Sequence, residues 1–222
     1  MELTEKLTQV EMFGGAVAWS FPDIADLRDI FLTYWYDRLP CKWLLMVDAD
    51  MQFKAELVRD MLQANKPLVG CLYPKKKFPI EWVGSALDEP DKPKDGIMEM
   101  RGVGGGVLLI RRDCVDQMIS GGSVQIVTDM ERSSVGLFLK QRGCNRFLRG
   151  FKRISREDGS DISEDYSFCQ RYRDVGGKIY VVTDHALTHW GWQQYTANYQ
   201  ESWDVENKGN AQSVRFFGQE SG

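Results

Sequence analysis

Two aspartates in the stretch "WLLMVDADMQF", residues 43–53, combine residue type and spacing in a way that indicates chemistry. Four apolar residues run straight into Asp48 and Asp50. Carboxylates are almost never fully buried unless something pairs with them. Hard divalent cations take oxygen ligands, often one or two carboxylates together with substrate phosphates. The pattern therefore predicts a Mg²⁺ or Mn²⁺ site at the end of a strand; the alternative is a pair of solvated aspartates in a turn.

A second pair of carboxylates, Glu164 and Asp165 in "SEDYSF", falls at the expected start of a helix. A helix N-terminus favours negative charge, so a purely structural role would explain the pair. The functional interpretation is a general base, held in a fixed frame, that takes a proton from a hydroxyl group.

The two histidines of the chain, His185 and His189, lie four residues apart in "DHALTHWG". On a helix this spacing would suit a metal, but the pair follows an expected strand, and no glutamate stands beside His185. We therefore do not expect a protease-type zinc site. One of the two histidines remains a candidate third metal ligand, and the alternative is a histidine with an ordinary hydrogen-bond partner.

Three lysines, 75–77, follow a strand end, and three glycines, 104–106, precede another strand. The lysines are either a solvated charge run or a means of stabilising a diphosphate. The glycines lack the G-x-G-x-x-G spacing and open a strand, not a helix, which argues against a dinucleotide or P-loop site. They are better suited to a close approach between backbone and ligand.

Composition limits the class of protein. The chain has 222 residues, 43% of them hydrophobic, and a formal net charge of −4. The acidic balance argues against a nucleic-acid partner. No apolar run reaches the ~18 residues that a membrane span needs, and the N-terminus lacks the pattern of a signal peptide. Five widely spaced cysteines without a Cys-x-x-Cys pair are typical of reduced thiols, so we expect a cytoplasmic protein.

The first third of the chain predicts alternating strands and helices. We expect a strand at 14–21, a helix from Pro22 to about Arg38 and a strand at 43–47, followed by a helix at 54–64 and a strand at 67–73. The apolar runs lack period-2 alternation, as in strands covered on both faces. Alternation of this kind favours parallel strands joined by crossover helices.

The rest of the chain is less regular. We expect a polar loop at 88–96, a glycine-led strand within 103–113, a short helix at 114–120, and a loop region at 129–161 with a strand near 135–139. Ser163 should cap a helix that ends at the glycine pair 176–177, and a strand should follow at 178–182.

Taken in order, these motifs resemble one family. They are the apolar strand with Asp-x-Asp, Tyr-Pro-x-Lys, the glycine-rich strand "LLIRRD", Glu-Asp-Tyr-x-Phe-Cys, Gly-Gly-Lys-Ile-Tyr and His-x-Gly, over about residues 14–195. The order resembles nucleotide-diphospho-sugar glycosyltransferases of the GT-A fold, close to family 2 and its viral and bacterial relatives. The resemblance implies a single α/β, Rossmann-like domain with a mixed, mainly parallel sheet flanked by helices.

The resemblance also implies roles on the donor side. Asp50 would be the direct Mn²⁺ or Mg²⁺ ligand, and Asp48, in the same metal-binding motif, would lie near the ribose and diphosphate. His189 would contact the metal or the diphosphate, and Arg28 would face the nucleotide. Lys75 would help to bind the diphosphate of the nucleotide sugar.

On the acceptor side, Asp165 would be the catalytic base, with Glu164 as its alternative. Gly104, Gly105 and Gly106 would border the donor sugar and the acceptor. The implied acceptor is a glycan, a lipid-linked molecule or a protein. A base facing the leaving group across the sugar would invert the anomeric carbon.

We therefore expect one glycosyltransferase domain over 1–200, with a nucleotide and metal half at about 14–85 and an acceptor half at about 97–195, followed by a polar tail at 201–222. Two other functions stay open. A sugar-nucleotidyltransferase shares the alternating elements and a metal aspartate but normally carries a glycine- and arginine-rich loop after its first strand. The many aromatics also fit a degenerate transferase that only binds a nucleotide sugar or a glycan.

Overall fold

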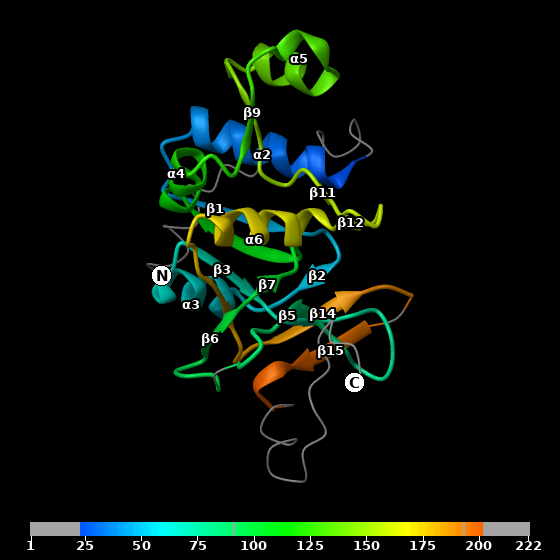
Figure 1. The fold of residues 1–222 in the computed structure, drawn as a ribbon. Coiled ribbons are helices and arrows are strands. Elements are labelled where there is room, and N and C mark those ends of the chain that lie inside the picture. The colour runs from blue at the N-terminus through cyan, green and yellow to red at the C-terminus, as the bar shows by residue number, and fades with distance from the viewer. Residues whose placement is uncertain (1–22, 91, 193, 202–222) are drawn as a thin grey trace.

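A five-stranded sheet forms the centre of the molecule, with helices on both of its faces (Figure 1). The computed structural model describes residues 23–90, 92–192 and 194–201, which form one domain of mixed α/β class. The strands, in their order across the sheet, are β1 (Trp43–Val47), β8 (Val107–Arg111), β3 (Leu68–Cys71), β13 (Ile179–Val182) and β6 (Ile97–Met100).

The prediction of a mainly parallel sheet is wrong. Of the four pairings in this sheet, only that of β3 with β13 is parallel; β8 runs antiparallel to both β1 and β3, and β6 runs antiparallel to β13. β1 and β3 point the same way and are joined by the helix α3 (Ala55–Ala64), but β8 lies between them. An apolar run indicates that a strand is buried on both faces. Central strands of an antiparallel sheet can be buried in the same way, so the runs do not show whether neighbouring strands are parallel.

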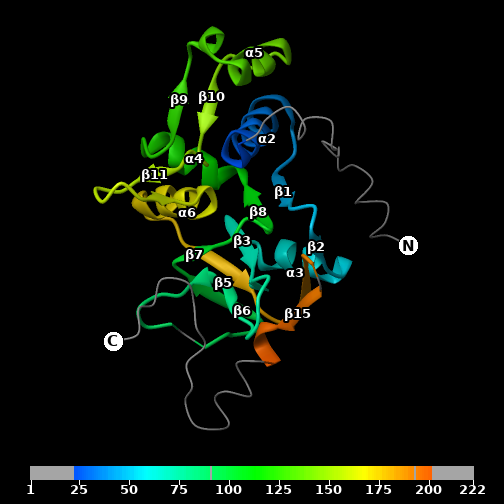
Figure 2. The ribbon, with the colours of Figure 1, turned by 90° about the vertical axis from the view of Figure 1, so that its right-hand side faces the viewer.

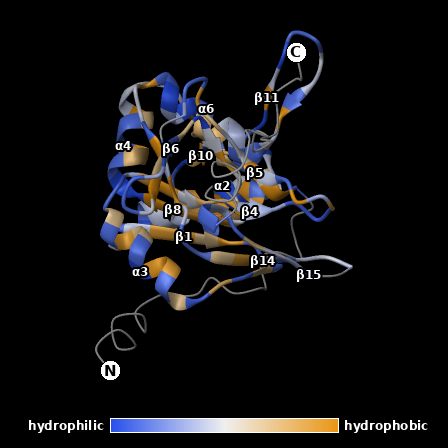
Figure 3. Cartoon of the chain, turned by 90° about the horizontal axis from the view of Figure 1, so that it is seen from below, coloured by the Kyte–Doolittle hydropathy of each residue, from blue (hydrophilic) through white to orange (hydrophobic). Residues whose placement is uncertain are grey.

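The two faces of the sheet are covered by different helices. Buried residues of α2 (Ile24–Arg38), α4 (Arg112–Ser120) and α6 (Glu164–Asp174) pack with one face. Leu57 and Met61 of α3 pack with the other. Figure 3 shows apolar residues gathered on the sheet strands β1 and β8, with polar residues on the outer sides of the helices. In the described part of the chain, no helix combines the length and apolar character that a membrane crossing requires.

The helix boundaries follow local capping chemistry. The side chain of Asp23 accepts the Ala25 N–H at 3.0 Å and so caps α2, which begins at Ile24, two residues later than the predicted start at Pro22. The helix α3 ends on Asn65 in the left-handed conformation, and α6 is followed by Gly176 at φ +81. Ser163 occupies the N-cap position of α6 as predicted, but its hydroxyl bonds to Asp165 instead of capping a backbone N–H.

The strand predicted near 135–139 is a helix, α5 (Ser134–Gln141). Ser133 caps it by accepting the Gly136 N–H at 3.0 Å, and Val135 and Leu139, four residues apart, face the interior. With β9 (Gln125–Val127), η2 (Met130–Arg132) and β10 (Phe147–Arg149), this helix forms a small lobe beside α2. The lobe lies at one end of the molecule in both views (Figure 1, Figure 2).

Short strands at the opposite end complete the fold. β14 (Ala186–Trp190) pairs on one side with β15 (Gln194–Asn198) and on the other with β2 (Met51–Gln52). The segment predicted as one strand at 67–73 is split into β3 and β4 (Tyr73–Pro74).

The other short strands of the described chain are β5 (Trp82–Ser85) and β7 (Gly102–Val103), and the separate pair β11 (Ile154–Ser155) and β12 (Asp161–Ile162).

The other predicted elements are present where the structure describes them. The helix predicted at 114–120 is α4, which begins two residues earlier, and the strand at 178–182 is β13. The strand predicted at 14–21 and nearly all of the predicted tail at 201–222 lie outside the described residues.

Candidate functional site

The turn after β1 separates the two aspartates. Met51 N–H donates to the Asp48 carbonyl at 3.1 Å, so the chain reverses between β1 and β2. On one side Asp48 N–H donates to the Gly106 carbonyl at 2.9 Å, because antiparallel pairing brings the start of β8 to the end of β1. On the other side Trp190 N–H donates to the Asp50 carbonyl at 2.8 Å. Each aspartate therefore faces a different set of partners.

Asp48 belongs to a cluster centred on Arg28 of α2. One guanidinium nitrogen of Arg28 donates to both Asp48 oxygens, at 2.8 and 3.0 Å, and the other donates to Glu164 Oε1 at 2.9 Å. The Arg28 side chain is only 6% exposed. Burial by itself would lower the pKa of Arg28, but the carboxylates of Asp48 and Glu164 more than offset it, and the pKa lies above its usual range. Three predicted site residues are thus joined by one buried charge.

The adjacent carboxylate, Asp165, is fixed by neutral donors. Its Oδ2 accepts the Gly105 N–H at 3.0 Å, and its Oδ1 accepts the Ser163 hydroxyl at 2.5 Å and the Tyr166 N–H at 2.8 Å. Glu164, 13% exposed, has Arg153 at 3.8 Å from its second oxygen. The pair at the start of α6 therefore lies directly against the glycine run that precedes β8.

The glycine run is required by the protein's own side chains. A Cβ on Gly105 would come closer than 3.0 Å to the Arg28 guanidinium, and one on Gly106 would strike the Tyr73 ring. A Cβ on Gly104 would collide with the Tyr73 hydroxyl, which accepts the Gly106 N–H at 3.1 Å. Burial raises the pKa of the Tyr73 phenol, so it stays protonated. The close approach predicted for these glycines is found, and it is to Arg28 and Tyr73.

Asp50 belongs to a second cluster, with Lys76 and His189. Its Oδ2 lies 2.5 Å from Lys76 Nζ and 3.5 Å from His189 Nε2. The other ring nitrogen of His189 is 2.9 Å from the Pro74 carbonyl, and the Tyr73 ring meets the imidazole edge-on at 5.2 Å. Burial alone would raise the pKa of Asp50, but Lys76 and His189 outweigh it and hold the pKa below its usual value.

We tested whether these residues fit a divalent cation. The described residues contain no group of three or more His, Cys, Asp or Glu side chains arranged to hold a metal. Asp50 and His189 supply two ligands that face each other, and the His189–Pro74 bond orients the ring as in known metal sites. Mg²⁺ and Mn²⁺ commonly take one or two protein ligands and complete their shell with phosphates and water. Asp50 and His189 fit that pattern, whereas Asp48 is held by Arg28.

Two residues singled out in the sequence have other partners. Lys75 Nζ bonds to Glu81 at 2.8 Å; Lys77 also pairs with Glu81, and the hydrogen bonds from these two lysines lower the pKa of Glu81 to about 2. His185 bonds to Asp60 of α3 at 3.0 Å. The lysine at the aspartate is Lys76, which the sequence indicated as a member of the run 75–77 and as the lysine of the Tyr-Pro-x-Lys motif.

Exposed aromatic rings lie beside the second cluster. We name Phe78, Trp190 and Trp192 the aromatic ledge; they are 63%, 42% and 105% exposed. Trp190 directly follows His189, and its indole N–H donates to the Gln52 side chain at 2.9 Å. Phe78 packs on Tyr195 of β15 with ring centres 5.2 Å apart. Large exposed apolar groups of this kind often mark a binding surface.

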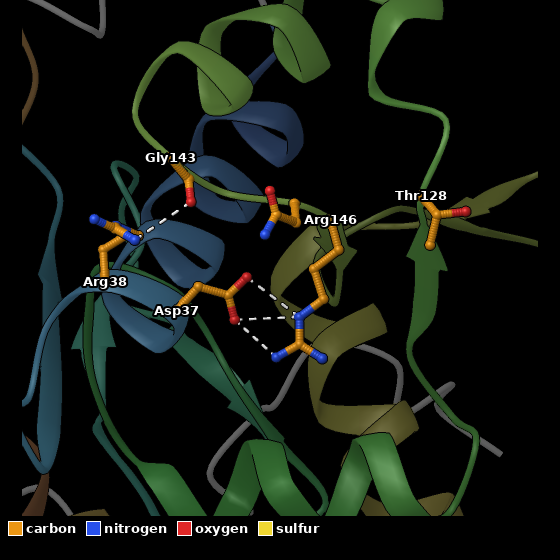
Figure 4. Close-up of a pocket in the computed structure, with 6 residues that line it drawn as sticks. Asp37, Arg38, Thr128, Gly143 and Arg146 are labelled. Carbon is orange, nitrogen blue, oxygen red and sulfur yellow. Dashed lines mark hydrogen bonds and ion pairs between the residues drawn. The ribbon is translucent and has the colours of Figure 1, made fainter.

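A concavity of about 420 Å³ lies elsewhere, in the small lobe. Asp37 of α2 accepts hydrogen bonds from Arg146 there, at 2.7 to 3.2 Å, and Arg38 approaches the Gly143 carbonyl (Figure 4). None of the residues predicted to carry chemistry lines this concavity. Its carboxylate, Asp37, already pairs with Arg146, and Arg38 faces a backbone carbonyl. The candidate site is therefore the one at the strand ends.

Comparisons with known proteins identify no family. No family model matches the chain, and no curated protein matches it. Among solved structures, one neighbour is described as "Crystal Structure of A197 from STIV". It is 16% identical, with a TM-score of 0.44, over 77% of this chain and 69% of that one. A likeness of this strength carries no argument about function.

Proposed function

We propose that the chain is a divalent-metal-dependent glycosyltransferase that moves a sugar from a nucleotide-diphosphate donor to a hydroxyl acceptor. One observation carries the proposal. Arg28 and Asp48 meet Glu164 and Asp165, which lie more than a hundred positions later in the sequence, in one cluster with the glycine run. Asp50, two residues after Asp48 in the same turn, forms the second pair with His189.

The chemistry follows from the two clusters. Bound at Asp50 and His189, a Mn²⁺ or Mg²⁺ ion would supply Lewis-acid stabilisation of the charge that develops on the leaving diphosphate. Asp165, positioned by the Gly105 N–H, takes the proton of the acceptor hydroxyl, with Glu164 as the alternative base. Arg28 fixes Asp48 and Glu164 in place and offsets part of their negative charge. A base opposite the leaving group gives inversion at the anomeric carbon.

The aromatic ledge supports a glycan as the acceptor. Aromatic rings offer flat apolar faces on which the C–H faces of sugar rings stack, while their polar edges bond to neighbours. Trp190 is the residue after His189, so the exposed rings lie on and beside the hairpin that carries the proposed metal pair. The nearby lysines 75–77 are paired with Glu81 and Asp50, so they add little free basic charge that would favour an anionic acceptor over a neutral glycan.

The test is turnover of a panel of nucleotide sugars with and without Mn²⁺. We expect transfer to oligosaccharide acceptors that requires the metal, and a fall on the order of 100-fold in Asp50→Ala, the scale of losing one electrostatic stabiliser of a transition state. Asp60→Ala is the matched control, because Asp60 pairs with His185 and Arg59 outside the site. Metal-independent turnover that survives Asp50→Ala would refute the metal role.

The same assay separates the two other functions. Release of pyrophosphate from a nucleoside triphosphate and a sugar phosphate would identify a nucleotidyltransferase. Tight donor binding in calorimetry without any turnover would identify a binding module. Product analysis by NMR of the anomeric proton decides whether transfer inverts the sugar.

A further inference from the structure

Two side chains converge on a single oxygen atom, Asp50 Oδ2. Lys76 Nζ is 2.5 Å away and His189 Nε2 is 3.5 Å away. The three residues come from separate segments: the turn after β1, the loop after β4, and β14. Register places them together, because His189 lies opposite Met51 in the β14–β2 pairing and Pro74 lies beside the imidazole.

The hydrogen bond to Pro74 determines which ring nitrogen of His189 carries a hydrogen and which one faces Asp50. A carbonyl oxygen only accepts, so His189 Nδ1 must carry the hydrogen in that 2.9 Å bond. His189 Nε2 is then the ring nitrogen that faces the Asp50 carboxylate, at 3.5 Å. A positive charge beside this carboxylate is stabilised by it. The Lys76 ammonium supplies that charge in this structure.

We propose that Lys76 is a built-in counter-cation of the Asp50–His189 pair and competes with a divalent ion for it. An ammonium and a metal ion cannot both lie against Asp50 Oδ2, because their like charges repel at contact distance. The ion therefore binds when Lys76 moves off. The inference rests on the metal role in the proposed function, and it adds the residue against which the metal must compete.

The surroundings suit a displaceable partner. The side chains of Lys76 and Asp50 are 38% and 40% exposed, so water and salt weaken their pair, and its release costs little. The aliphatic stem of Lys76 lies against the β14–β15 turn, where a Cβ on Gly191 would come within 3.1 Å of its Cδ. The stem can keep this contact while the ammonium swings towards a phosphate of the donor.

The neighbouring lysine provides a matched control. Lys77 is one position along the chain and pairs with Glu81, not with Asp50. Lys76→Met keeps the length of the stem and removes its charge, and Lys77→Met makes the same change in net charge outside the pair. A difference between the two variants therefore reports the contact with Asp50 and not the overall charge of the protein.

The experiment is calorimetric titration of Mn²⁺ into the intact chain, without any nucleotide sugar. We expect Lys76→Met to bind Mn²⁺ about 3- to 10-fold more tightly than the wild type, the scale of a half-exposed ion pair. Lys77→Met should stay within about 2-fold of the wild type, since its charge is screened from the site. Asp50→Ala added to Lys76→Met should abolish the binding, which assigns it to this site.

Two results would overturn the inference. One is Mn²⁺ affinity in Lys76→Met that equals or falls below that of the wild type, with a folded variant by circular dichroism. The other is the same increase in Lys77→Met, which would indicate net charge alone. Either result leaves sugar transfer untouched, whereas loss of the proposed function would appear as absent turnover regardless of Mn²⁺ affinity.

Discussion

A single buried charge organises the candidate site at the scale of residues. The guanidinium of Arg28 is planar and presents separate nitrogens to Asp48 and to Glu164. Removing it would leave two carboxylates close together in a poorly solvated place. A compact ammonium cannot form both contacts in the same geometry, so a lysine at this position is not a conservative replacement.

We expect Arg28→Ala to lower the free energy of unfolding by about 2 kcal/mol, less than for a fully buried pair because Asp48 is 37% exposed. Arg28→Lys should recover only part of that loss. Urea denaturation measures both. Arg59→Ala is the control, since its pair with Asp60 is exposed and its loss should leave stability close to that of the wild type. Wild-type stability in Arg28→Ala would show that the carboxylates do not depend on it.

At the scale of elements, the hairpin of β14 and β15 positions more of the candidate site than any other described element. It carries His189 on one strand and continues into the aromatic ledge at its turn. Pairing with β2 ties it to the aspartate turn, so the ledge and the proposed metal pair are held in one frame. An acceptor bound on the ledge would thus be positioned by the same strand that holds the imidazole.

Trp192→Ala should raise the KM for a glycan acceptor about 3- to 10-fold, the scale of one aromatic contact, and leave the KM for the donor within about 2-fold. Initial rates over an acceptor series measure this. Leu137→Ala, a change at an exposed apolar residue of α5, should leave both constants unchanged. An unaltered acceptor KM in Trp192→Ala would remove the ledge from the acceptor site.

At the scale of the whole molecule, a carboxyl group of the described residues lies in an unfavourable place. Asp29 of α2 is fully buried; its Oδ1 accepts the Phe151 N–H at 2.6 Å, while its Oδ2 has no hydrogen-bond partner. Arg149 Nε lies 3.9 Å from that second oxygen. Burial raises the pKa of Asp29 well above its usual 3.8. The native protein therefore keeps this proton to a higher pH than the unfolded chain does.

That difference fixes the sign of a pH effect on stability. Above pH 3.8 the unfolded chain loses the Asp29 proton first, so the native state binds more protons and the free energy of unfolding falls as pH rises towards the native pKa. Asp29→Asn keeps an acceptor for Phe151 N–H and removes the titration. Its stability relative to wild type should increase with pH by up to about 1.4 kcal/mol per pH unit across that window.

Thermal or urea unfolding at a series of pH values from about 4 to 8, the range above an ordinary carboxyl pKa, measures this difference. Asp88→Asn, at a side chain that is 91% exposed, is the control and should run parallel to the wild type. Parallel curves for Asp29→Asn would show that the buried carboxyl does not titrate differently in the folded chain.

The elements that the sequence predicted well are those with local causes. The apolar strand β1, the amphipathic helix α3, and α6 with its glycine end depend on burial patterns and caps within a few residues. The helix α5 was missed, although Ser133 and the spacing of Val135 and Leu139 carried the same kind of signal. Its short length and the surrounding charged residues concealed the pattern.

The sequence by itself determined which residues could carry chemistry: two aspartates at a strand end, a carboxylate pair at a helix start, and a glycine run. Only the tertiary structure decided their partners. It inserted β8 between β1 and β3, paired Arg28 with Asp48 and Glu164, and brought Lys76, not Lys75, to Asp50. Strand order and ion pairs join residues tens of positions apart, and their energies depend on the closure of the whole chain, to which local residue patterns contribute no information.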